Sequence, residues 1–235
     1  MTSVLLLGSG PNVVAAQHWD VRSFDHIVVI NNAWQVRPDW THLIHPSDFP
    51  EDRMPPNVSP GQRIVKAQDY VPLQNQYGGF VYAGGTMAFT ASYWALAALR
   101  PSVIAVLGCD MVYPKTSNTH FYGQGTADPL REDKTLRSLE AKSARVMVKA
   151  AQQGCAMVNL STDESRLVFP RSTLEQASRS TPQDYREVLV NAAEKEEERL
   201  GYYVPSGKYW KEEDRFDVAA IDALDDIWLK SIQHP

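Results

Sequence analysis

Short apolar runs recur along the first two thirds of this 235-residue chain, separated by glycine, proline and asparagine. Four of them, at residues 3–7, 26–30, 102–107 and 155–160, are almost continuously apolar. Such runs are typical of parallel strands, because helices cover both faces of a parallel sheet. Residues 41–45 predict one further, shorter strand. The pattern therefore predicts an α/β fold with a doubly wound, mostly parallel sheet.

Two helices are expected between these strands. Residues 87–99 follow Thr86, whose hydroxyl can accept a hydrogen bond from a free amide at a helix start, and Pro101 stops this helix. Residues 130–153 carry a rough apolar stripe and are followed by Gly154, which is typical of a longer helix with a glycine end.

The stretch 49–78 has a different character, because it contains several prolines and few consecutive apolar residues. It predicts a long irregular connection, with one short strand at residues 63–65. Long connections of this kind are often binding loops or lids.

The composition changes after residue 171, where the last apolar strand region ends and charged, helix-forming segments begin. We therefore expect a sheet domain at residues 1–171 and a helical tail at residues 172–235. The tail is expected to pack either on the sheet domain or on a partner subunit.

Two helices are expected in this tail. The first starts at Pro182 with Thr181 as its cap and runs to about residue 200, and its charged run at 194–199 predicts a solvated face. The second covers residues 217–232 and has an apolar side. That side leaves self-association into a homo-oligomer open. It comprises Val218, Ile221, Leu224, Ile227, Trp228 and Ile232.

Composition narrows the function classes. The formal net charge is −5 and no Lys/Arg cluster stands out, so we expect no nucleic-acid partner. No apolar run approaches the roughly 20 residues that a transmembrane helix needs. A core strand follows the first residues without a basic leader, so we expect a cytoplasmic protein. Cys109 and Cys155 lie in strand-like runs and are expected to be free, buried thiols.

Candidate chemistry gathers where the predicted strands end. A glycine loop at residues 8–12 follows the first strand, Asn31 and Asn32 follow the second, and Asp110 follows the strand at 102–107. The carboxyl ends of parallel strands meet at one edge, where ligands bind in open α/β sheets. The loop is similar to a phosphate-binding loop, with Pro11 in the first turn of a helix.

The glycine loop lacks the dinucleotide fingerprint, because Val13 occupies the position of its third glycine. Asn31 and Asn32 stand where a nicotinamide-dinucleotide protein would carry an acidic residue. Amides could instead contact a base, a ribose or a phosphate, although asparagine is also a common turn residue.

Two further segments are expected at the same edge. Gly84, Gly85 and Thr86 begin the helix at 87–99, and free amides at a helix start favour phosphate. The loop at 112–125 contains His120, the side chain there best suited to proton transfer near neutral pH. Packing of His120 against Tyr113 or Tyr122 is the structural alternative.

His42 and His45 lie in the predicted third strand. No cysteine or carboxylate stands near them at the spacing of a zinc site. We therefore interpret both as ordinary strand histidines rather than as metal ligands.

Taken in order, these motifs resemble two related groups of Rossmann-like proteins over residues 3–171. One comprises bacterial CMP-sialic-acid-dependent sialyltransferases, and the other comprises 6-hydroxymethylpterin pyrophosphokinase-like proteins. The shared features are the glycine–x–glycine–proline loop, an asparagine after the second strand, a small-residue helix start and a glycine–x–aspartate strand end. The last strand also leads to an asparagine–x–serine segment, and a Phe-Pro pair closes the region. In this chain they are Gly8-Ser9-Gly10-Pro11, Asn31 or Asn32, Gly84-Gly85-Thr86, Gly108-Cys109-Asp110, Asn159-Leu160-Ser161 and Phe169-Pro170.

The sialyltransferase resemblance implies a metal-independent glycosyltransferase that needs no cofactor and uses a CMP-linked sugar donor with a glycan or other hydroxyl acceptor. It implies that His120 is the general base and that tyrosines assist the donor phosphate. The expected catalytic residues are His120, Asp110, Tyr113 and Tyr122, and the expected nucleotide-binding residues are Gly8, Ser9, Gly10, Pro11, Asn12, Asn31, Asn32, Gly84, Gly85 and Thr86.

The second group implies a different activity. It would transfer diphosphate from ATP to a hydroxymethylpterin-like substrate, with Mg²⁺ on carboxylates such as Asp110 and Asp48. A nucleotide-binding protein without catalysis is the third alternative.

Overall fold

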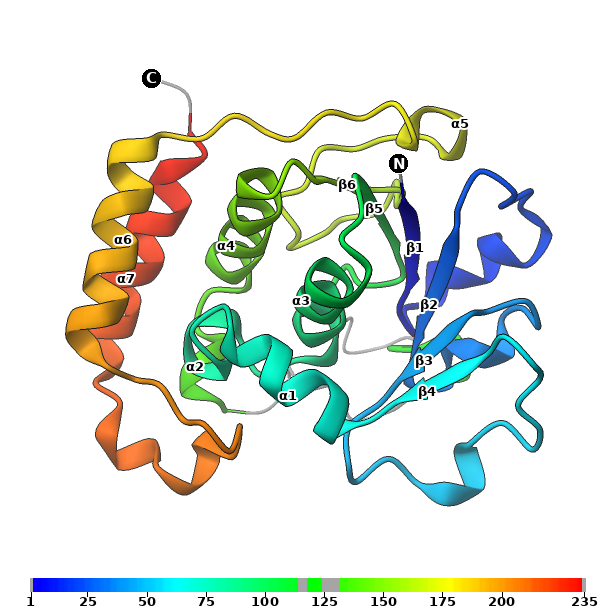
Figure 1. The fold of residues 1–235 in the computed structure, drawn as a ribbon, viewed down its shortest axis with the longest axis horizontal. Coiled ribbons are helices and arrows are strands. Elements are labelled where there is room, and N and C mark those ends of the chain that lie inside the picture. Colours follow the sequence, from blue (N-terminus) through cyan, green and yellow to red (C-terminus); the bar gives the residue numbers. More distant parts are fainter. Residues whose placement is uncertain (1, 114–117, 124–131, 234–235) are drawn as a thin grey trace.

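The structure is a computed structural model that describes residues 2–113, 118–123 and 132–233. Within these residues, six parallel strands form one sheet in the order β4-β3-β2-β1-β5-β6 (Figure 1). The sheet confirms the predicted doubly wound α/β fold. Its strands are β1 Ser3–Leu7, β2 His26–Ile30, β3 His42–Ile44, β4 Arg63–Val65, β5 Val103–Leu107 and β6 Ala156–Asn159.

Both faces of the sheet are buried, which explains the continuous apolar runs. Val4 and Leu6 of β1 point into a core on one face, whereas Leu5 and Leu7 point into a core on the other. The first face is covered by α1 Ala67–Asn75, α2 Phe80–Ala83, α3 Met87–Leu99 and α4 Leu139–Gln152. The second is covered by the 3₁₀ helices Pro11–His18 and Asn31–Gln35 and by α5 Leu174–Ala177.

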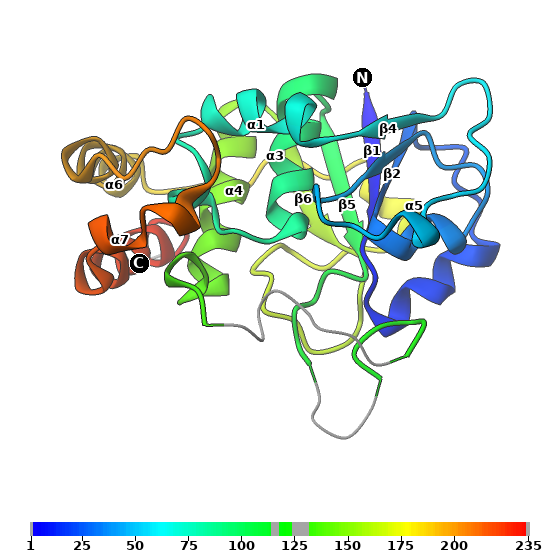
Figure 2. The ribbon, with the colours of Figure 1, turned by 90° about the horizontal axis from the view of Figure 1, so that it is seen from below.

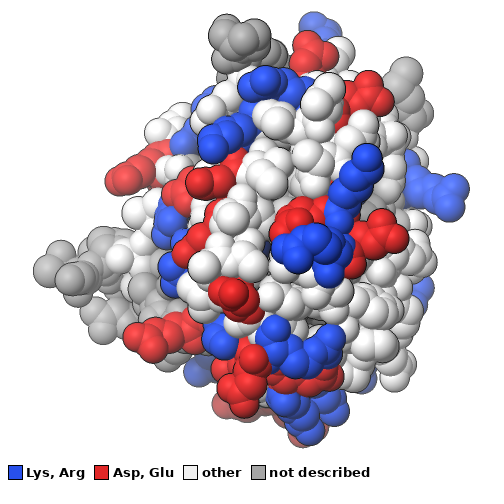
Figure 3. All heavy atoms as spheres, turned by 90° about the vertical axis from the view of Figure 1, so that its left-hand side faces the viewer, with Lys and Arg blue, Asp and Glu red and all other residues white. Residues whose placement is uncertain are grey.

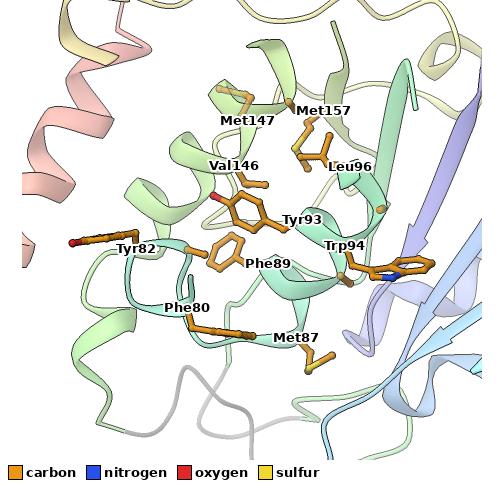
Figure 4. Close-up of a cluster of buried hydrophobic side chains, with 14 of the residues drawn as sticks. Phe80, Tyr82, Met87, Phe89, Tyr93, Trp94, Leu96, Val146, Met147 and Met157 are labelled. Carbon is orange, nitrogen blue, oxygen red and sulfur yellow. The ribbon is translucent and has the colours of Figure 1, made fainter. Parts of the chain in front are cut away.

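Helix α3 lies at the centre of the first core. Thr86 caps it as predicted, and its hydroxyl oxygen accepts a hydrogen bond from the amide of Ala88 at 3.4 Å. Figure 4 shows Phe89 and Tyr93 of α3 close to Val146 of α4. All three side chains are buried. Helix α3 is apolar on nearly every side because it lies between the sheet and α4.

Two helix predictions need correction. Helix α4 begins at Leu139 rather than at residue 130, because the Ser138 hydroxyl accepts from the amide of Ala141 and caps it there. The first two residues of the predicted helix, 130 and 131, lie outside the described residues. The irregular connection at 49–78 contains the predicted strand β4, but it also contains α1, which tolerates Pro72 in its interior.

The tail folds into α6 Glu187–Leu200 and α7 Val218–Ser231, which lie side by side next to α4 (Figure 1). Helix α6 begins later than the predicted Pro182, and the amide of Arg186 at its start donates to the carbonyl oxygen of Ser231. Thr181 therefore does not cap it. Ile221, Leu224 and Trp228 are buried within the chain. This burial removes most of the apolar face that had suggested self-association.

A buried ionic network joins this tail to α4 and corrects the interpretation of the charged run at 194–199. Glu197 is only 9% exposed, and its carboxylate accepts two hydrogen bonds of 2.7 Å from Arg145. Lys142 and Asp225 form a second buried pair at 2.7 Å. The outer face of α6 and α7 carries interspersed acidic and basic side chains (Figure 3). Because these links lie within one chain, the tail packs on its own sheet domain.

None of the helices in the described ranges is both long and apolar enough to cross a membrane.

Candidate functional site

A cleft of about 660 Å³ lies at the carboxyl edge of the sheet, where the loops after β1, β2 and β5 meet. Figure 2 shows the loops after β1 and β5 on the same side of the molecule. The strand order reverses between β1 and β5, which is where open α/β sheets bind ligands. Twelve of the predicted site residues line this cleft: Gly8, Ser9, Gly10, Pro11, Asn12, Asn31, Asn32, Thr86, Asp110, Tyr113, His120 and Tyr122.

The glycines of the first loop let two strand ends approach each other closely. The amides of Gly8 and Gly10 donate to the carbonyl oxygens of Leu107 and Gly108, both at 2.8 Å. A Cβ atom at Gly8 would lie 2.3 Å from the carbonyl oxygen of Gly108. These two amides are therefore already used within the protein, so they do not supply the free phosphate-binding donors that the sequence suggested. The helix that follows is a 3₁₀ helix, and Pro11 occupies its first turn as predicted.

Asp110 is held by amide side chains on two sides. Its Oδ2 accepts from Nδ2 of Asn12 at 2.7 Å, and its Oδ1 accepts from Nδ2 of Asn159 at 3.1 Å. Asn12 Nδ2 also donates to Ser161 Oγ at 2.9 Å. These bonds fix the orientation of Asn12, whose Oδ1 is buried and has no hydrogen-bond partner among the described residues. Asp110 therefore acts here by positioning Asn12.

A second amide oxygen without a partner comes from the end of β2. Asn31 has a left-handed backbone with φ of 53°, which asparagine tolerates better than most residues. Its Oδ1 is buried and has no hydrogen-bond partner in the described part of the chain. Ser9 joins the two loops, because its hydroxyl donates to the carbonyl oxygen of Ile30 at 3.2 Å. Asn12 and Asn31 thus both line the cleft, and each has a buried amide oxygen without a partner among the described residues.

His120 lies over the same cleft in a segment that contacts the first loop. The amide of Phe121 donates to the carbonyl oxygen of Ser9 at 3.1 Å. Nδ1 of His120 is 2.9 Å from the hydroxyl oxygen of Thr119, and burial lowers the pKa of His120 from its ordinary value. Burial therefore favours the neutral imidazole, which is the form that a general base requires.

The predicted packing of His120 against tyrosines is also present. Its ring stacks on Tyr122 with centroids 5.0 Å apart, and the ring of Tyr113 lies 6.2 Å away. Aromatic packing therefore orients an imidazole that also lines the cleft, and the role of His120 as a general base stays a prediction.

Gly84 and Gly85 lie outside the lining of the cleft. The amide of Gly85 donates to Thr135 Oγ1 at 2.9 Å, and a Cβ atom at this position would lie 1.9 Å from the hydroxyl oxygen of Tyr209. A Cβ atom at Gly84 would lie 3.0 Å from atoms of Lys142. Both glycines make room for other parts of the protein, and only Thr86 of this predicted trio reaches the cleft.

The lining also includes residues that the predicted site lacked, among them Phe49, Arg53, Asp163 and Glu164. Phe49 and Arg53 come from the proline-rich connection, where no periodic pattern distinguishes one polar residue from another. Asp163 and Glu164 follow β6, so their position at a strand end was the available signal.

The cysteines and His42 follow their predictions, whereas His45 comes just after β3, and its buried Nε2 has no partner among the described residues. Ring nitrogens of His42 and His45 contact Thr41 and the carbonyl oxygen of Pro46, and burial lowers the His42 pKa to about 4. Cys109 and Cys155 are free and buried, and burial raises the pKa of both thiols.

Across the described ranges, no three His, Cys, Asp or Glu side chains form a group that could hold a metal ion. Asp48, Asp110, Asp163 and Glu164 nevertheless all line the cleft.

Comparisons with protein-family models, curated proteins and solved structures found no match to this chain. The sialyltransferase-like and pyrophosphokinase-like resemblances therefore stay predictions. The α/β fold itself is established by the parallel sheet and the helices on both of its faces.

Proposed function

We propose that this protein transfers a sugar from a nucleotide-activated donor, CMP-linked by preference, to a hydroxyl group of an acceptor. One observation carries the proposal: an imidazole whose pKa is lowered by burial lines one cleft, at the switch point of the sheet, with two asparagines whose amide oxygens have no partner among the described residues. These groups belong to His120, Asn12 and Asn31. They supply a base and two hydrogen-bond acceptors in the region where an α/β sheet binds nucleotides.

The amide oxygens suit a nucleoside. Ribose hydroxyls and the exocyclic amine of cytosine are hydrogen-bond donors, and they would satisfy buried oxygens that otherwise carry a desolvation cost. The cleft volume of about 660 Å³ lies within the range of small-molecule sites, about 300–1,000 Å³. Arg53, which also lines the cleft, adds a positive charge that favours phosphate.

The proposed reaction is a direct displacement. His120 removes the proton of the acceptor hydroxyl while that oxygen forms a bond to the anomeric carbon. The bond between the anomeric carbon and the phosphate oxygen breaks, and its electron pair leaves with CMP. We expect Tyr113 and Tyr122, whose ring centroids lie 6.2 Å and 5.0 Å from that of His120, to donate through their hydroxyls to the leaving phosphate.

The contacts of Asp110 favour this reaction over metal-assisted chemistry. Both of its carboxylate oxygens already accept hydrogen bonds from Asn12 or Asn159, so it is committed to holding the site together. The acidic lining formed by Asp48, Asp163 and Glu164 supports one second candidate, Mg²⁺-dependent diphosphate transfer from ATP to a hydroxymethylpterin-like substrate.

Thermal unfolding separates these candidates, because a ligand that binds the folded state raises the melting temperature by mass action. We expect CMP, CDP and a CMP-linked sugar to raise it without added metal. A rise with ATP and Mg²⁺ and none with the cytidine ligands would favour diphosphate transfer instead. A rise with CMP but no turnover of any CMP-linked sugar would indicate a binding protein without catalysis.

His120→Ala tests the mechanism. We expect turnover to fall about 100-fold, which is the lower range for loss of a general base, while CMP affinity changes less than about twofold. His18→Ala is the matched control, because this histidine is exposed and lies outside the cleft. Unchanged turnover in His120→Ala would remove His120 from the mechanism.

The pH profile gives an independent readout. A base acts when deprotonated, so kcat/KM should rise with pH through the His120 pKa, which burial lowers from its ordinary value, and then level off. His120→Ala should lose this acid limb.

A further inference from the structure

A second hollow of about 360 Å³ adjoins the cleft on the side of α4 and the loop after β6. The two hollows share a wall, so molecules bound in each would contact the same residues. The shared residues are Met111, Val112, Tyr113 and Glu164, and the second hollow adds Glu140, Ser165 and Arg166.

An ion pair between Glu140 and Arg166 lines this hollow, and two hydrogen bonds fix its geometry. Arg166 donates to Glu140 through two bonds, Nε to Oε1 at 2.7 Å and Nη2 to Oε2 at 2.9 Å. The backbone amide of Arg166 donates to the carbonyl oxygen of Asp110 at 2.9 Å, and this hydrogen bond connects the ion pair to a residue that lines the first cleft. Both side chains remain about 40% exposed, so their outer atoms stay accessible to a ligand.

Ser165 adds a hydroxyl group beside this pair. Its Oγ accepts from Asn159 Nδ2 at 3.1 Å and from the amide of Leu167 at 3.2 Å. Both interactions use the oxygen as an acceptor, so the hydroxyl proton is left for a further partner. Asn159 also donates to Asp110, and it therefore connects the two hollows through a single amide group.

The second hollow combines charged and neutral hydrogen-bonding groups. Glu140 and Glu164 carry two negative charges, and Arg166 carries one positive charge. Carboxylate oxygens, guanidinium N–H groups and a serine hydroxyl together suit neutral hydroxyl groups, which donate and accept hydrogen bonds.

The shared wall also brings this hollow near the proposed base. Tyr113 lines both hollows, and its ring centroid is 6.2 Å from that of His120. We propose that the second hollow is the acceptor subsite, where a neutral polyhydroxylated molecule such as a terminal sugar binds beside the donor. This assignment rests on the proposed transferase function, and it identifies Glu140 and Arg166 as residues that select the acceptor.

The experiment measures glycoside and CMP binding separately on the full chain. Saturation-transfer NMR would probe neutral methyl glycosides of glucose, galactose and mannose against a charged counterpart, methyl glucuronide, and calorimetry would measure CMP. We expect Glu140→Gln/Arg166→Gln to weaken glycoside binding about tenfold, the effect of losing one charge-assisted hydrogen bond. CMP affinity should stay within about twofold of the wild-type value.

Two further variants keep the outcome interpretable. Glu196→Gln/Arg199→Gln removes a comparable exposed pair on α6 and should alter neither ligand. Arg166→Lys keeps the charge but loses the two-pronged geometry, so it should weaken glycoside binding even if the double variant fails to fold.

The outcomes distinguish this assignment from the proposed function. If the wild-type protein does not bind CMP, the proposed donor site is refuted, and the transferase proposal is refuted with it. If CMP binds but no neutral glycoside does, if methyl glucuronide binds more tightly, or if folded variants bind glycosides normally, the acceptor assignment is overturned while the donor site stands.

Discussion

Two regions of this protein bury polar side chains, and they treat them in opposite ways. At the junction of α4 with α6 and α7, Arg145 donates to the carboxylate of Glu197, to the hydroxyl of Tyr93 and to the carbonyl oxygen of Tyr77. Glu197 also accepts from Nε1 of Trp228 at 2.9 Å. In the cleft, by contrast, the amide oxygens of Asn12 and Asn31 have no partner among the described residues.

The difference indicates that the polar side chains of the junction stabilise the fold, whereas those of the cleft are left for a ligand. A buried polar group costs free energy unless it is hydrogen-bonded, so a protein that leaves one without a partner gains nothing for its own fold. The junction contains one such atom, Asp225 Oδ2, but the other oxygen of this carboxylate pairs with Lys142 at 2.7 Å. Buried atoms without a partner also occur outside both regions, as in the side chain of Gln74, so it is the position of Asn12 and Asn31 in the lining of the cleft that leads us to expect a ligand to satisfy them.

The largest effect is expected from breaking the junction. Arg145→Met leaves the carboxylate of Glu197 buried without its cation, and we expect a loss of about 3–5 kcal/mol in the free energy of unfolding. Urea denaturation measures this loss. CMP affinity of the remaining folded protein should be unchanged, because Arg145 does not line the cleft.

Arg199→Met is the control for this variant. Arg199 pairs with Glu196 on an exposed surface, where an ion pair contributes about 1 kcal/mol or less. Equal losses in the two variants would show that the junction network does not hold the tail in place.

The same contrast explains how far the sequence could lead. The strands were predictable because each is a local apolar run, and β1, β2 and β4 have the predicted bounds. The burial of Glu197 was not predictable, because its neighbours are charged and exposed while its partner Arg145 lies in another helix. Helix α1 was not predicted because it contains Pro72, and a proline in the interior of a helix usually breaks the helix.

The position of the site was predictable for a similar reason, since strand ends in a parallel sheet converge. The roles of its glycines were not. Glycine favours a close approach of any kind, and the sequence does not say whether a ligand or another part of the chain approaches. At Gly8 the neighbour is the backbone of Gly108, and at Gly85 it is Tyr209 of the tail.

The next largest effect tests this assignment of Gly85. In Gly85→Ala the new methyl group would meet the Tyr209 hydroxyl, and we expect a loss of about 1–3 kcal/mol in the free energy of unfolding from overpacking. In a Tyr209→Leu background the same substitution should cost less than about 0.5 kcal/mol, because the obstructing ring is gone. A double-mutant cycle by urea denaturation measures the difference.

Calorimetric titration of CMP into Gly85→Ala completes the test. An unchanged affinity is expected, because Gly85 does not line the cleft. A large loss of CMP affinity without a loss of stability would instead return Gly85 to the nucleotide site, as its position before α3 first suggested.

The smallest effect is expected from a substitution in the cleft, Asn31→Gly. Asn31→Gly removes an amide oxygen that the free protein does not use, and glycine readily adopts the left-handed backbone found there. Stability should therefore change by less than about 1 kcal/mol, because relief of backbone strain offsets the added freedom of the unfolded chain. CMP affinity should fall about fivefold, the effect of one neutral hydrogen bond of about 1 kcal/mol.

Asn57→Gly is the matched control, since Asn57 is exposed and lies outside the cleft, and it should leave CMP affinity unchanged. Calorimetry and urea denaturation on both variants measure the two quantities independently. If Asn31→Gly lost stability and kept its CMP affinity, Asn31 would serve the fold as Arg145 does. An oxygen without a protein partner would then no longer identify the nucleotide site, and the contrast between the two regions would lose its functional meaning.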